Sequence, residues 1–145
     1  MNKEFVPYDQ ALELKELGFD EPCLGYYRKD NPTLKFGEGL ELVTRNYRCN
    51  VMHYPLKNSR YVAGSSAPDG YYYLTTSPTF SQVFRLFREK YKLEYHIKSD
   101  MMGYHIYIVD RNINRTKFTG NNIFQTYEEA EVACLNKLIE LCKKI

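Results

Sequence analysis

The sequence is poor in the residues that build metal centres and nucleophilic sites. It has three histidines and four cysteines in 145 residues. The sequence contains none of four common catalytic patterns. These are the HExxH motif, the P-loop, a Ser-His-Asp order and a paired carboxylate with a defined neighbour. Cys49 and His53 form one C-x-x-x-H pair, but zinc needs four ligands and no second pair stands at a suitable spacing. We therefore expect no metal, no cofactor and no catalytic residue, and so a protein that is not an enzyme.

Two further absences concern the compartment. No apolar run approaches the roughly 18 residues of a membrane-spanning helix, and the first residues, "MNKE", lack the apolar region of a signal peptide. The cysteines lack the spacing of a disulfide framework. Cys134 and Cys142 stand eight residues apart on an expected helix, about 12 Å, whereas a disulfide tolerates roughly 7 Å between Cα atoms. We expect reduced thiols, no membrane contact and a cytoplasmic location.

The chain is long enough to form one domain with a hydrophobic core. Leu, Ile, Val and Phe make up about a quarter of it, above the roughly 20% below which disorder is the default. The net charge of +2 is unevenly distributed, because residues 42–99 hold nine Lys/Arg against three Asp/Glu, and residues 1–41 hold five against nine. The positive middle segment favours an acidic partner.

A helix followed by short strands is predicted for the first half. The apolar residues of "PYDQALELKELGFDEP", residues 7–22, recur at helical spacing, and Gly18 suits the C-terminal stop. "CLGYYR" is typical of a short strand. Turn residues dominate residues 28–79, with strand-like runs at 40–44, 47–54 and 71–75 whose pairing order stays open.

The clearest helix signal lies in residues 77–91. Either Ser77 caps this helix with Pro78 in its first position, or Thr79 and Gln82 form a capping box. Its apolar side chains share one helix face: Phe80, Val83, Phe84, Phe87 and Tyr91.

From Leu93 onwards the apolar period changes from 3.6 to 2, which predicts strands. One strand starts at Leu93, a second covers residues 104–109, and a weaker third covers residues 117–124. Thr126 and Glu129 form a capping box that opens a last helix. The expected inner side of that helix comprises Ala130, Ala133, Cys134, Leu138, Leu141 and Ile145. The predicted fold class is α+β: a single domain over residues 1–145, in which residues 77–145 form an α-β-β-β-α unit with an antiparallel sheet, joined by an N-terminal helix and short strands.

Several strings of the sequence resemble a recurrent protein family. "SPTFSQVF" and "LFREKYKL" are followed about thirty residues later by "TYEEAEVACLNKLIELCK", and the N-terminal "VPYDQALELKELGFDEPCLGYY" is similar to the same group. Its members are uncharacterised proteins carried by prophages and mobile elements of gut bacteria, and they more often have Trp where this chain has Leu86. The resemblance covers both ends of the chain. It implies a phage-related context and no established activity.

The α-β-β-β-α order is also similar in topology to the double-stranded RNA-binding domain, which recognises RNA through shape and phosphates. In that family a basic cluster stands at the start of the last helix, where amide donors and cations meet phosphate. This chain has Glu128, Glu129 and Glu131 there. Three carboxylates favour the helix dipole but would repel a phosphate backbone.

The segment "RNYRCNVMHYPLKNSRY", residues 45–61, combines cations with tyrosines, and no acid occurs from residue 42 to residue 68. Single-stranded nucleic-acid binding requires cations for phosphates and aromatic faces for bases. Protein interfaces also use Tyr and Arg as anchors, and a third interpretation is that the tyrosines pack in strands while the cations are solvated. The candidate binding residues come from this segment and from the basic side of the 77–91 helix: Arg45, Tyr47, Arg48, Tyr54, Lys57, Arg60, Tyr61, Arg85 and Arg88.

Two classes of function follow. The sequence favours a phage-related accessory protein that acts by binding a protein partner rather than by catalysis. The alternative is binding of single-stranded nucleic acid without sequence preference through residues 45–61, to which Arg85 and Arg88 contribute if the fold brings them near. His96 and His105 fall on neighbouring expected strands, where a cross-strand polar pair is a commoner role than catalysis. The identity of the partner and the oligomeric state stay open.

Overall fold

The structure is a computed structural model that describes residues 2–19, 21, 23–28, 33–36, 40–44, 47–51, 61–63 and 71–144. Backbone contacts divide the chain into two compact units, residues 1–79 and 80–145. The described residues confirm an α+β fold with a C-terminal α-β-β-β-α unit, an N-terminal helix and short strands. That residues 1–145 form a single domain stays a prediction.

The helix of the first unit, α1 (Tyr8–Glu16), stops where the sequence predicts. Gly18 takes the left-handed conformation with φ +85°, which costs glycine little. The N–H of Gly18 donates to the Lys15 carbonyl and the N–H of Phe19 donates to the Leu14 carbonyl, both at 3.0 Å. These two bonds form a Schellman motif, and both Phe19 and Leu14 are buried.

An antiparallel sheet completes the first unit, with the strand order β2-β1-β6-β5-β3-β4 that the sequence left open. Its strands are β1 (Gly25–Arg28), β2 (Lys35–Phe36), β3 (Leu40–Thr44), β4 (Tyr47–Val51), β5 (Tyr61–Ala63) and β6 (Tyr71–Ser77). The carbonyl of Val6 holds the chain before α1 against this sheet, because it accepts bonds from the hydroxyls of Tyr27 and Ser77, each at 2.8 Å.

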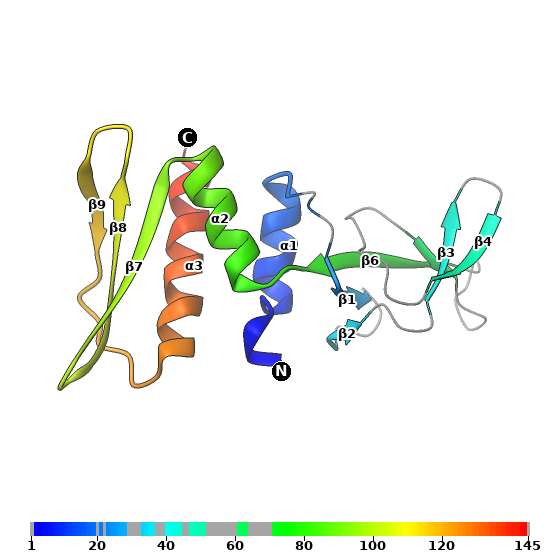
Figure 1. Cartoon of the computed structure of the whole chain (residues 1–145), viewed down its shortest axis with the longest axis horizontal. Coiled ribbons are helices and arrows are strands. Elements are labelled where there is room, and N and C mark those ends of the chain that lie inside the picture. Colours follow the sequence, from blue (N-terminus) through cyan, green and yellow to red (C-terminus); the bar gives the residue numbers. More distant parts are fainter. Residues whose placement is uncertain are drawn as a thin grey trace. The chain divides into compact units, whose positions relative to one another are not determined.

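The second unit contains α2 (Phe80–Lys90), β7 (Leu93–Asp100), β8 (Gly103–Asp110), β9 (Arg115–Thr119) and α3 (Tyr127–Lys143). Both helices lie on the same side of the β7-β8-β9 sheet (Figure 1). The cap prediction with Ser77 and Pro78 is wrong, because Ser77 ends β6 and α2 begins only at Phe80. The alternative prediction, in which Thr79 precedes the helix as its cap, matches the observed start of α2 at Phe80.

The third strand of this sheet differs from its prediction. β9 covers residues 115–119 rather than 117–124. Beyond it the N–H of Gly120 still donates to the Ile106 carbonyl at 2.9 Å. The chain then leaves β8 to reach α3, and Phe124 touches the sheet again only through an isolated bridge to Tyr104.

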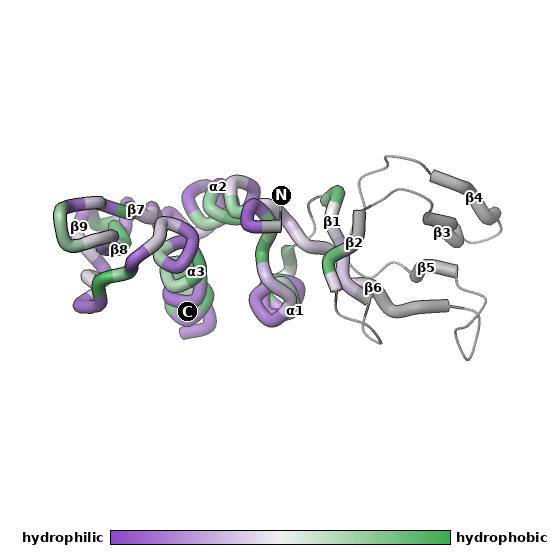
Figure 2. Tube along the Cα trace, turned by 90° about the horizontal axis from the view of Figure 1, so that it is seen from below, coloured by the Kyte–Doolittle hydropathy of each residue, from purple (hydrophilic) through white to green (hydrophobic). Residues whose placement is uncertain are grey.

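Four of the five residues of the predicted apolar face are buried: Phe80, Val83, Phe84 and Phe87. Tyr91, the fifth, follows the end of α2 and is half-buried. The Phe84 ring stacks on Tyr95 of β7 at 3.7 Å between centroids. Figure 2 shows hydrophobic residues in green and hydrophilic ones in purple along both α2 and α3.

The start of α3 confirms the predicted cap, because the Thr126 hydroxyl accepts a bond from the Glu129 N–H at 3.2 Å. The predicted inner side is correct for Ala130, Cys134 and Leu138, which are buried. Ala133 and Leu141 are only half-buried, whereas Leu135 and Ile139 are buried although the pattern omitted them. The buried stripe is displaced because α3 packs on α2 as well as on β7 and β8. Ile145 lies outside the described residues.

Candidate docking surface

The β7–β8 turn is held by one carboxylate. Oδ1 of Asp100 accepts the backbone N–H groups of Met102 at 2.7 Å and of Gly103 at 3.2 Å. Its Oδ2 lies 2.7 Å from Nε2 of His105. The bond from the Met102 amide, followed by those from His105 and Gly103, holds the pKa of Asp100 below its ordinary value. Asp100 is therefore ionised at neutral pH and keeps the turn in one conformation.

This turn exposes apolar side chains at one end of the second unit. Met101 is fully exposed at 103%, and Met102 is 68% exposed. Ile123 lies beside Gly103, the residue after Met102, because its Cγ2 is 2.8 Å from the position that a Cβ on Gly103 would occupy, and it is 42% exposed. Tyr127, 40% exposed, meets the Tyr104 ring edge-on at 5.9 Å. We call Met101, Met102, Ile123 and Tyr127 the tip cluster.

Two backbone hydrogen bonds join the two halves of the tip cluster. The N–H of Tyr104 donates to the Phe124 carbonyl at 2.8 Å, and the N–H of Phe124 donates to the Tyr104 carbonyl at 2.9 Å. They fasten the segment before α3 to the start of β8. The four side chains, which come from residues far apart in the sequence, are therefore presented on a fixed backbone.

The electrostatic surroundings of the tip cluster are mainly acidic. Asp100 lies in the turn itself, and the first turn of α3 carries Glu128 and Glu129. Burial and the neighbouring charge of Glu128 raise the pKa of Glu131, one turn further along. Lys98 of β7 is an exposed cation on the same hairpin, so acids outnumber cations at this end.

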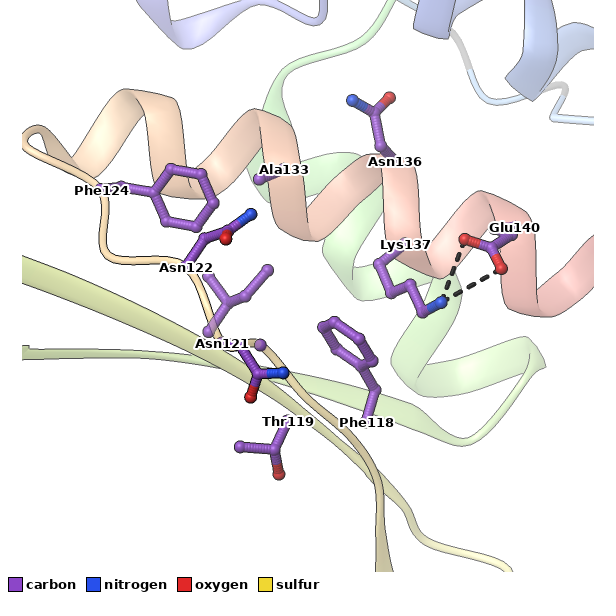
Figure 3. A pocket seen from close by; sticks show the side chains of 11 residues that line it. Phe118, Thr119, Asn121, Asn122, Phe124, Ala133, Asn136, Lys137 and Glu140 are labelled. Atoms are coloured by element: carbon purple, nitrogen blue, oxygen red, sulfur yellow. Dashed lines mark hydrogen bonds and ion pairs between the residues drawn. The ribbon is translucent and has the colours of Figure 1, made fainter.

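A separate pocket of about 410 Å³ lies between α3, the β8–β9 strands and the chain after β9 (Figure 3). The helix contributes residues at i, i+3, i+4 and i+7, which form one face of α3: Ala133, Asn136, Lys137 and Glu140. Phe118 points from β9 toward Lys137 (Figure 3), whose Nζ lies 4.6 Å from the centre of the Phe118 ring. The same Nζ donates to both carboxylate oxygens of Glu140, at 3.1 and 3.0 Å.

Of the nine predicted binding residues, the structure describes the side chains of two. Arg85 and Arg88 stand on α2, within one turn of each other, and both are exposed. Tyr47, Arg48 and Tyr61 belong to strands β4 and β5, but their side chains lie outside the described part. The other four, Arg45, Tyr54, Lys57 and Arg60, lie outside the described residues. Whether residues 45–61 lie near Arg85 and Arg88 was left open by the sequence, and the side chains of that segment lie outside the described part.

The histidines do not pair with each other across the sheet. The β7–β8 register sets His96 opposite Tyr107 and His105 opposite Lys98. The ring of His96 stacks on Tyr107 at 4.6 Å between centroids, and His105 bonds to Asp100. Within the ranges that the structure covers, no group of three or more His, Cys, Asp or Glu side chains could hold a metal ion.

Cys23, Cys134 and Cys142 are buried and have no disulfide partner among the described residues. Burial raises the pKa of Cys23 and of Cys134 to about 12 and that of Cys142 to about 11. A thiol that stays protonated at neutral pH is a poor nucleophile. This agrees with the predicted position of Cys134 on the inner side of the last helix, and Cys142 is buried on the same helix. Buried free cysteines of this kind act as small hydrophobic residues.

Neither a scan of protein-family models nor searches of curated proteins and of solved structures finds a match to this chain. In the part of the chain that the structure describes, no helix has the length and apolar character needed to cross a membrane. The fold and its surfaces define an α+β protein whose function is inferred from its own residues. Sequence reasoning missed the tip cluster, although two large apolar residues in the turn "DMMG" were a signal for it.

Proposed function

We propose that this chain is a non-catalytic accessory protein of a prophage or mobile element, and that it acts by binding a protein partner through the tip cluster. The observation that carries the proposal is the exposure of Met101 and Met102 on a turn that Asp100 holds in place. Methionine and aromatic residues are enriched in protein interfaces, and the side chains that contribute most of the binding energy lose contact with water on binding. A backbone already fixed before binding lowers the entropy cost of association.

The chemistry of this end favours a protein over a nucleic acid. Methionine side chains are flexible and polarisable and adapt to apolar pockets of partner proteins, but they offer nothing to a phosphate. Asp100, Glu128 and Glu129 would repel a phosphate backbone. A partner with an apolar pocket and basic residues at its rim fits both features.

The resemblance to phage-related proteins supports the accessory role, and the poor nucleophilicity of the buried thiols supports a function without catalysis. Nucleic-acid binding remains the second candidate, because Arg85 and Arg88 are exposed together on α2. That surface would bind single strands through the same cations that the sequence singles out.

The test compares two double variants of the full chain as baits in cells that carry the element. We expect the variant with Met101→Ser and Met102→Ser to bind the wild-type protein's partner more weakly, with an affinity reduced about 30-fold or more. That is the effect of losing one hot spot of about 2 kcal/mol. Stability should change by less than about 0.5 kcal/mol because both side chains are exposed. The matched control, Arg85→Glu with Arg88→Glu, should retain the same partner. A partner lost only in the control would contradict the proposal.

The second candidate has its own assay, fluorescence anisotropy with a labelled single strand at about 50 and 200 mM salt. Nucleic-acid binding predicts an affinity that falls by about 0.7 log units per log unit of salt for each phosphate contacted. It also predicts weaker binding by the Arg85→Glu, Arg88→Glu variant to all sequences alike. No binding at the lower salt concentration would eliminate this candidate.

A further inference from the structure

The second unit has an edge strand whose outer side is available for pairing. The strand order is β7-β8-β9, and among the described residues no strand pairs with the outer side of β9. The Gly120 N–H points toward β8, because it donates to the Ile106 carbonyl. Backbone groups of successive residues in a strand point to opposite sides. The N–H and carbonyl of Thr119, which is exposed, therefore point outward.

The pocket between α3 and β9 adjoins this edge. Its lining includes the apolar side chains of Ile106, Phe118 and Phe124 and the amides of Asn121 and Asn122. Side chains of an extended peptide alternate between the two faces of the sheet that it joins. A peptide paired with β9 would thus direct every second side chain toward α3, and one of these could enter the pocket. Recognition by strand addition commonly combines backbone bonds with such side-chain pockets.

The charge around the edge selects the partner. Arg115 and Lys117 of β9 are exposed, and the pairing register passes over Lys117 at a β-bulge. On the helix side stand Lys137 and Lys144, both bonded to Glu140. Like charges that face each other across paired strands are unfavourable. A second copy of β9 is therefore disfavoured as the strand that pairs with this edge. An acidic segment has the complementary charge.

We propose that the outer edge of β9 binds an extended acidic peptide segment as a fourth strand, with one apolar side chain of that segment in the pocket between α3 and β9. This surface shares no residue with the tip cluster, so either assignment can fail while the other holds. The pairing would use the outward backbone groups of Thr119, and Lys117 and Arg115 would meet the acidic side chains.

The probe is a library of labelled seven-residue peptides in which Asp or Glu alternates with varied apolar residues. A matched library has Lys in place of every acid. With the full-length protein at about 50 mM salt, we expect the acidic library to yield binders at least about tenfold tighter than the basic one. N-methylation of the peptide residues that face β9 should abolish binding without any change to the protein. Acidic peptides that do not bind, or that bind equally well when N-methylated, would overturn the proposal.

Two protein variants locate the site. Thr119→Pro removes the outward N–H, and proline is tolerated on an edge where that N–H faces solvent. We expect it to weaken binding of the selected peptides at least about tenfold, and Thr119→Ala to change it less than about twofold. Lys117→Glu should also weaken binding. Peptide affinities unchanged by Thr119→Pro, or reduced only by Met101→Ser with Met102→Ser, would assign the peptides to another surface and overturn the proposal. So would displacement of the peptides by a single-stranded oligonucleotide that binds the same edge more tightly.

Discussion

Among the described glycines, Gly103 is the one whose replacement by alanine should disrupt the tip cluster most. Gly103 has φ +143°, and a Cβ there would lie 2.5 Å from the Phe124 carbonyl oxygen and 2.8 Å from Ile123 Cγ2. The backbone strain costs about 1–3 kcal/mol. Moving Phe124 away breaks two backbone bonds to Tyr104, each worth about 0.5–1.5 kcal/mol. The expected loss of stability is about 2–6 kcal/mol.

Two other glycines separate the two causes of this loss. Gly18 also has a positive φ, but nothing lies within 4 Å of its added Cβ, whereas Gly120 lacks a positive φ and would meet Ile106 Cγ1 at 2.9 Å. Gly18→Ala should therefore lower the free energy of unfolding through backbone strain alone, by about 1–2 kcal/mol. Gly120→Ala should lower it through steric crowding alone. Urea unfolding followed by NMR, with amide hydrogen exchange at Tyr104 and Phe124, measures all three. If Gly103→Ala lowers the free energy of unfolding no more than Gly18→Ala does, residues 123–124 do not contact the turn and the tip cluster is not assembled as described.

Three further predictions concern the core and two titrations. Phe87→Ala should cost about 3–5 kcal/mol in urea unfolding because Phe87 is fully buried, and a loss below about 1 kcal/mol would mean that this face of α2 meets solvent. Cys23 and Cys134 should resist alkylation in the folded protein at pH 8 and should react after denaturation without reductant. Burial raises the pKa of each thiol from 9.0 to about 12. Their contribution to stability is therefore present below pH 9 and lost as the pH rises through 12. By NMR, the pKa of the Asp100 carboxyl should lie below its ordinary value of 3.8. Its stabilisation of the turn is then present above pH 3.8 and is lost as the pH falls through the lowered pKa. A midpoint at or above 3.8 would contradict the bond that Asp100 accepts from the Met102 N–H.

The sequence predicts those parts of the fold that depend on neighbouring residues. Gly18 and Phe19 end α1 through local backbone bonds, and the Thr126 cap needs only Glu129, three residues away. The spacing of Phe84 and Phe87 fixes the buried face of α2 in the same way. The prediction for the buried side of α3 was only partly correct. Leu135 and Ile139 are also buried, since α3 packs on α2 as well as on the sheet, and a helical period does not contain that information.

The candidate surfaces were harder to predict because they join distant residues. "DMMG" is recognisable as a turn, but Ile123 reaches it only because Phe124 bonds to Tyr104 across the sheet. The pocket arises because β9 ends at Thr119, five residues before the predicted end of that strand. The basic segment 45–61, which the sequence singled out, lies mostly outside the described residues.

The most direct test of the central claim is site-specific photo-crosslinking in the cells from which the chain comes. A photoreactive amino acid replaces Met102 in one version of the full chain and Arg88 in another, both at exposed positions. Binding of a protein partner through the tip cluster predicts a discrete protein adduct from position 102 that disappears when Met101→Ser is added, and no such adduct from position 88. A nucleic-acid adduct from position 88, with none from position 102, would contradict it.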